Sequence, residues 1–190
     1  MDMHALGLGN VVLATAGFAL LNCVFVALQM QTKIVSGVKD GGNFDRFDYS
    51  LGNGLYKMGD RTLLNLQEQI VLYLPCMWCY ALFCGNAERA GNLGLVWLVF
   101  RIFYPLLWSF KGKWNLWVEL STQPSYAICN WYIFHMLRAV LFSATDDWAL
   151  AYIPVVHVLV TLCFFAFGAG LGKLCAMGFD QEKPKQKKNK

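Results

Sequence analysis

The chain has 190 residues, of which 57% are hydrophobic and 15% are charged, and its formal net charge is +4. Soluble globular domains carry about 25% charged residues, so this composition favours an integral membrane protein. The basic residues flank apolar stretches and form no aromatic-interleaved basic face. This distribution argues against a nucleic-acid partner and favours contact with anionic membrane lipid.

Five apolar stretches are candidates for membrane-spanning helices, because about 20 residues of helix cross the hydrocarbon of a bilayer. They cover residues 6–30, 62–84, 93–110, 126–142 and 148–171. The first stretch is too long for the apolar core of a signal peptide, so we expect it to be a retained helix. The pattern predicts an all-α integral membrane protein with five spans.

The basic residues also predict the orientation of these spans. They gather between the first and second stretches, after the third, and in the C-terminal tail, whereas the last hairpin carries Asp146 and Asp147. With five spans the three basic segments lie on one side, and basic loops stay cytoplasmic. We therefore expect a lumenal N-terminus and a cytoplasmic C-terminus.

A polar face at the beginning of the second stretch is the first candidate for a functional site. Arg61, Asn65 and Glu68 are spaced i, i+4 and i+7, which places them on one side of a helix. The residues that follow, 69–84, include no charge. A charged side chain inside a membrane is costly unless it faces a partner, a cavity or a ligand.

The third stretch carries a second polar face, with Arg101, Tyr104 and Trp108 at i, i+3 and i+7. The short connection between the two stretches predicts antiparallel neighbours, and a rise of about 1.5 Å per residue places Glu68 and Arg101 at matching depth. Pairing would lower the cost of burying either charge. The alternative is that the ion pair is purely structural and fixes the helix register.

Two further patterns carry weaker signals. Cys76 and Cys79 have redox spacing but lie within an apolar stretch, where cysteine packs as a small hydrophobe. His135 and His157 fall on the fourth and fifth stretches at similar predicted depth, as a bis-histidine haem would need. A hydrogen-bonded packing role is the simpler interpretation of both histidines, and we expect no metal.

The two polar motifs resemble those of the membrane-associated proteins in eicosanoid and glutathione metabolism (MAPEG), in particular the microsomal glutathione transferases. The resemblance covers residues 33–141 and implies a four-helix transmembrane bundle that assembles as a homotrimer. We accordingly expect a MAPEG-like domain over residues 1–143. An additional fifth transmembrane helix would follow at 144–176, and a basic cytoplasmic tail at 177–190.

The resemblance also implies an activity. It points to a membrane-bound transferase or peroxidase that uses glutathione as co-substrate and acts on a lipophilic electrophile or lipid hydroperoxide. Arginine suits the carboxylates of glutathione, and cationic surroundings increase the thiolate that attacks the electrophile. The residues implied in glutathione binding are Arg61, Asn65, Glu68, Arg101, Tyr104 and Lys33, and those implied in catalysis are Tyr104 and Tyr126.

Two of the chain's departures from the family pattern bear directly on catalysis. Trp108 stands where many members have a second tyrosine, and residues 122–126 lack the arginine that often begins the fourth helix. Gln123 and Pro124 resemble the loop that precedes that helix. These departures leave open a second function, a non-catalytic scaffold or an accessory subunit of a larger membrane complex.

The last four residues suggest a location. Lys187 and Lys188 stand three and two positions before Lys190, which resembles a dilysine retrieval signal of the endoplasmic reticulum. Such a signal is an address read by a receptor and requires a cytoplasmic tail. We expect residence in the endoplasmic reticulum membrane, the alternative being another organelle membrane.

Replacing Lys187 and Lys188 with serine is predicted to release the protein from the endoplasmic reticulum, because the receptor loses both lysines. The matched control replaces Lys183 and Lys185, which removes the same charge from the same tail. Fluorescence microscopy of tagged full-length chains measures the distribution. An unchanged distribution of the first variant contradicts the prediction.

Overall fold

The computed structural model describes residues 7–39, 54–84, 86–113, 115–143 and 148–181, with side chains up to residue 173. These residues form α-helices and one short 3-10 helix and contain no strand. The elements are α1 (Gly9–Lys39), α2 (Gly54–Phe83), α3 (Ala87–Ser109), α4 (Leu116–Phe142), η1 (Leu150–Tyr152) and α5 (Ile153–Gln181).

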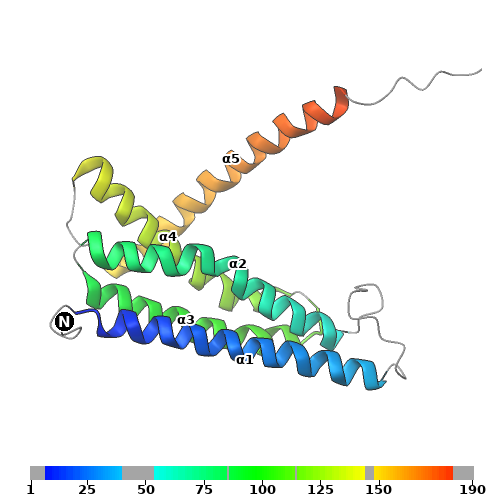
Figure 1. The fold of residues 1–190 in the computed structure, drawn as a ribbon. Coiled ribbons are helices and arrows are strands. Elements are labelled where there is room, and N and C mark those ends of the chain that lie inside the picture. The colour runs from blue at the N-terminus through cyan, green and yellow to red at the C-terminus, as the bar shows by residue number, and fades with distance from the viewer. Residues whose placement is uncertain (1–6, 40–53, 85, 114, 144–147, 182–190) are drawn as a thin grey trace, which may run out of the picture.

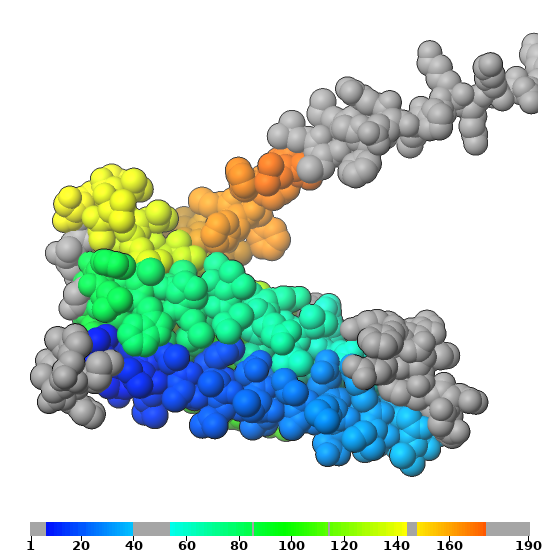
Figure 2. Space-filling model, in the orientation of Figure 1, coloured from blue at the N-terminus to red at the C-terminus, as the bar shows by residue number. Residues whose placement is uncertain are grey.

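Helices α1 to α4 form a bundle, and α5 leaves it at a steep angle (Figure 1). Helix α3 contacts α1, α2 and α4, whereas α5 packs mainly against α4. The space-filling view shows α5 projecting clear of the other helices (Figure 2). From residue 162 to residue 173 every side chain of α5 is exposed.

The sequence of α1 explains how it joins the bundle. Its buried residues Val11, Ala14, Phe18, Leu21 and Phe25 recur at intervals of three and four, which makes one continuous apolar stripe. The other side of α1 is also apolar and exposed. A helix that is apolar all round is typical of a membrane span, where lipid covers the outer face.

Buried aromatic residues align the inner helices. The rings of Tyr73 and Trp97 stack at a centroid separation of 3.9 Å, and the Tyr73 hydroxyl donates to the Gly94 carbonyl oxygen at 3.1 Å. The Tyr132 hydroxyl donates to the Ala90 carbonyl oxygen at 2.8 Å. Buried tyrosines need such partners, so these two bonds restrict the register of α2 and α4 on α3.

Three helical segments among the described residues are long and apolar enough to cross a membrane: Gly9–Lys39, Ala87–Ser109 and Leu150–Lys173. Helices α2 and α4 are not apolar enough by the same criterion, so the expected count of five spans is not confirmed. What the structure supports is an all-helical membrane protein. Helix α5 continues to Gln181, beyond the expected boundary at residue 176.

Two expected helix boundaries are wrong. Helix α2 begins at Gly54, so Arg61 lies two turns inside it rather than at its start. Helix α4 begins at Leu116, so Gln123 and Pro124 lie within the helix rather than in a loop. The cause in α4 is Asn115, whose side chain accepts from the Trp117 N–H at 3.0 Å and caps the helix earlier.

The closest approach of α1 and α3 depends on a glycine. A Cβ atom at Gly91 would lie 2.5 Å from backbone atoms of Asn10 and Val11, which cannot move aside as a flexible side chain can. Beside this contact, the Asn10 side chain donates to Asn92 Oδ1 at 2.7 Å. The missing side chain therefore permits both the helix contact and the hydrogen bond.

Gly91→Ala is predicted to destabilise the bundle by about 1–3 kcal/mol, the usual cost of overpacking, because α1 and α3 must separate. Gly168→Ala is the matched control, since nothing lies within 4 Å of a Cβ atom built there. Thermal unfolding in detergent measures the difference. Equal melting temperatures for the two variants would show that the approach is looser than described.

Candidate functional site

A cavity of about 220 Å³ lies between α2, α3 and α4. It brings together the polar faces expected on the second and third helices. Residues from α4 that the sequence analysis had not assigned complete it. The lining residues are Arg61, Asn65, Glu68, Tyr104, Trp108, Val118, Glu119 and Thr122.

The side chains of α2 that line the cavity differ in their exposure to solvent. Arg61 and Glu68 are exposed, whereas Asn65 between them is half-buried. Opposite them, Tyr104 and Trp108 of α3 are 4% and 7% exposed. The cavity therefore has charged groups at its accessible side and aromatic groups at its closed side.

Arg101 lies directly behind this cavity and is fully buried. Its Nη2 donates to Asn65 Oδ1, and its guanidinium carbon lies 4.8 Å from the centroid of the Tyr104 ring. Both partners line the cavity. The expected ion pair with Glu68 is wrong, because the Asn65 amide, one turn before Glu68, occupies that place.

Several donors beside the cavity have no acceptor among the described residues. They are Nε and Nη1 of Arg101 and Nε1 of Trp108. A buried guanidinium without a carboxylate, and a buried indole N–H without an acceptor, each carry a desolvation penalty. This donor set suits a ligand with carboxylate and carbonyl oxygens, as a peptide-like molecule has.

Tyr126 lies apart from Tyr104. It is half-buried on α4, one turn beyond Thr122, and lines a second cavity that lies between α4 and α5. The two tyrosines implied in catalysis are therefore on different cavities within one chain.

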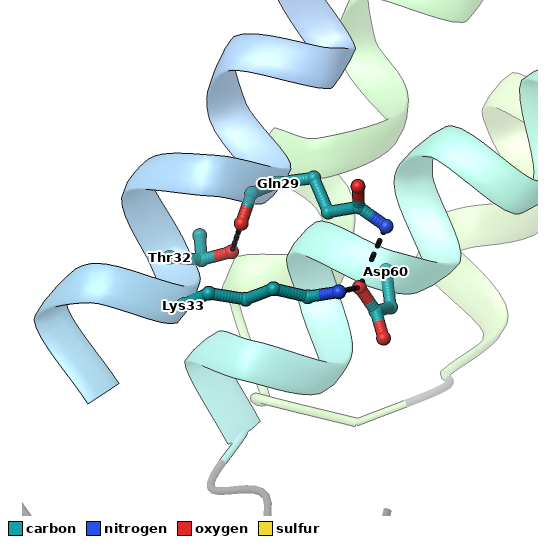
Figure 3. Close-up of polar contacts among 4 residues, drawn as sticks. All are labelled: Gln29, Thr32, Lys33 and Asp60. Atoms are coloured by element: carbon teal, nitrogen blue, oxygen red, sulfur yellow. Dashed lines mark hydrogen bonds and ion pairs between the residues drawn. The ribbon is translucent and has the colours of Figure 1, made fainter. Parts of the chain in front are cut away.

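Lys33 is also absent from the lining of the first cavity. Its side chain points instead toward Asp60 (Figure 3). Its Nζ lies 3.0 Å from Asp60 Oδ1, and Gln29 Nε2 donates to the same oxygen at 2.8 Å. Asp60 is nearly buried, so this ion pair ties α1 to α2 immediately before Arg61. The sequence analysis missed this cluster. Its available signal was the i, i+4 spacing of Gln29 and Lys33 on α1.

The two histidines do not meet. His135 packs against aromatic rings, the nearest being Trp131 at a centroid separation of 4.4 Å. His157 contacts Asn130 at 3.0 Å and Gln123 at 3.1 Å. The expectation of matched depth is wrong, because both partners of His157 lie more than one turn from His135 along α4.

Residues 11–120 match the model of the MAPEG family, which is more than half of the chain. The chain belongs to the MAPEG family. The match includes the α2 and α3 walls of the first cavity and Val118 and Glu119 of α4, but it ends before α5 and before the residues of α4 that line the second cavity. No curated protein and no solved structure matches the chain.

Asn65→Ala is predicted to lower the unfolding free energy by about 1–3 kcal/mol, because it removes the hydrogen-bond acceptor of a buried guanidinium. Glu68→Ala should change it by less than about 0.5 kcal/mol, as expected of an exposed side chain. Chemical unfolding in a common detergent compares the two. If Glu68→Ala lowers the unfolding free energy more than Asn65→Ala does, the result would contradict this prediction and support an ion pair between Glu68 and Arg101.

Proposed function

We propose that this MAPEG protein is a membrane-bound glutathione transferase or peroxidase. The observation that carries the proposal is the first cavity. Four residues implied in glutathione binding line it, and the fifth, Arg101, lies behind it with two unpaired nitrogens. A site whose buried donors have no acceptor and that opens toward exposed charged groups is suited to a small zwitterionic peptide.

The chemistry of each residue suits a part of glutathione. Arg61 would bind a carboxylate with two parallel hydrogen bonds, and Glu68 would hold the ammonium group. Asn65 would bind a peptide group. The buried charge of Arg101 and the hydroxyl of Tyr104 would favour the thiolate over the thiol, and the thiolate is the attacking species.

The size of the cavity favours an oligomer. About 220 Å³ is below the roughly 300–1,000 Å³ of most small-molecule pockets, so one chain supplies part of a glutathione site. We propose that a neighbouring copy in a homotrimer completes it and that Lys33, Tyr126 or both act across that boundary. The lipophilic co-substrate would enter from the bilayer.

The proposal extends to topology and location. Five spans with a cytoplasmic C-terminus would place the exposed charges of Arg61 and Glu68 near the cytoplasmic surface, where glutathione is available. The length of α2 and α4, 30 and 27 residues, supports this arrangement. Residence in the endoplasmic reticulum depends on the tail, which lies outside the described residues.

A second candidate is a non-catalytic scaffold or accessory subunit. Two observations favour it: Lys33 is already paired with Asp60, and no arginine stands at residues 122–126. Under this alternative the Arg101–Asn65 contact fixes the helix register and has no role in binding.

Arg61→Ala is predicted to weaken glutathione binding about ten- to hundredfold, the scale of one charged hydrogen-bonded group. Lys57→Ala is the matched control, because it removes the same charge one turn earlier on α2 and does not line the cavity. Calorimetry on the detergent-purified protein measures both affinities.

Two results would reject the enzyme in favour of the scaffold. One is the absence of binding by the unaltered protein at millimolar glutathione. The other is equal affinity in Arg61→Ala and the unaltered protein, since the exposed guanidinium would then play no part.

A further inference from the structure

A second cavity, of about 410 Å³, lies between α4 and the first half of α5. Its size is within the range of pockets that hold small molecules. One side carries the polar residues Gln123, Asn130, His157 and Thr161, and the other carries aromatic rings that include Phe164. Leu72 of α2 also lines the cavity and is the one lining residue inside the family match; the others lie beyond residue 120.

The polar residues form a continuous chain of hydrogen bonds from α4 to α5. Asn130 Nδ2 contacts His157 Nδ1 at 3.0 Å, and His157 Nε2 contacts Gln123 Oε1 at 3.1 Å. Gln123 Nε2 then donates to Glu119 Oε2 at 2.6 Å. Glu119 belongs to the first cavity, so the chain joins the two cavities along α4.

The Glu119 carboxylate fixes the direction of the bonds that Gln123 makes in this chain. A carboxylate only accepts, so Gln123 must present its amide nitrogen to Glu119 and its oxygen to His157. His157 then donates from Nε2 to Gln123, and its Nδ1 lies against the Asn130 amide. Both imidazole nitrogens are therefore in use within the chain of hydrogen bonds.

What remains for a ligand is uncharged. Tyr126 and Thr161 supply hydroxyl groups, which donate and accept, and no lysine, arginine or carboxylate is among the lining residues. Thr161 Oγ1 already accepts from Asn130 Nδ2 at 3.3 Å, and a hydroxyl oxygen has a second lone pair for a ligand. An anionic head group would find no counter-charge, and a cationic one would find no carboxylate. Phe165 is 73% exposed, which makes the aromatic side accessible to a lipid chain.

We propose that the cavity between α4 and α5 binds an amphipathic lipid with an uncharged hydroxyl or carbonyl head group. The head group bonds to the hydroxyls of Tyr126 and Thr161, and the chain lies along Phe164 and Phe165. This site goes beyond the proposed function, because it uses α5 and does not require glutathione.

The test uses the full chain in phosphatidylcholine vesicles and a photoreactive long-chain alcohol, with the acid and the amine of equal length for comparison. The alcohol should label peptides around Gln123 to Asn130 and His157 to Phe165. Thr161→Trp fills the cavity and should reduce labelling about tenfold, the effect of losing about 1.4 kcal/mol. Leu159→Trp is the matched control, since Leu159 is exposed and does not line the cavity.

Stronger labelling by the alcohol than by the acid or amine, lost in Thr161→Trp and kept in Leu159→Trp, supports the proposal. Equal labelling of both variants, even labelling along the exposed surface of α5, or equal labelling by the charged probes overturns it. The melting temperatures of both variants are measured first. If Thr161→Trp is unfolded, Thr161→Phe takes its place. None of these results depends on glutathione binding.

Discussion

The arrangement of the first cavity depends on a single buried cation. Arg101 lies inside the bundle with an amide and an aromatic ring as its nearest polar and π partners, and none of its guanidinium nitrogens bonds a carboxylate among the described residues. A charge in that position persists only if neighbouring helices hold it firmly and if something supplies the missing acceptors. Its burial thus connects helix packing to ligand binding, because the residues that restrain it also line the cavity.

The rest of the bundle keeps that cation in place. At one end of the site, Lys33 and Gln29 of α1 bind the Asp60 carboxylate of α2. Helix α1 therefore restrains the position of the next residue, Arg61. Farther along α2, the stacking of Tyr73 on Trp97 fixes its register against α3. The part of α2 that lines the cavity is therefore fixed at one end by the polar contacts of Asp60 and at the other by the stacking of Tyr73 on Trp97.

Helix α5 adds a feature that the family match does not include. Helix α4 presents one face to the first cavity and an adjacent face to the second, and Gln123 bridges them. A helix shared in this way can hold two ligands close together without placing them in one pocket. The exposed remainder of α5 gives the protein a large apolar surface outside the bundle, as a lipid-covered segment requires.

The sequence by itself determined the helical membrane character and the grouping of Arg61, Asn65 and Glu68 on one face, because these follow from composition and helical periodicity. Its two polar motifs indicated the family by their resemblance to known members. It could not decide whether Arg101 bonds Asn65 or Glu68. These two residues are about one turn apart, and a depth estimated from the rise per residue does not distinguish between them. It misplaced the start of α4, because the expected stretch followed apolar character from residue 126, whereas the Asn115 cap begins the helix at Leu116. Only the tertiary structure separated Tyr126 and Lys33 from the cavity, since which neighbour a side chain reaches depends on how the helices are rotated and packed.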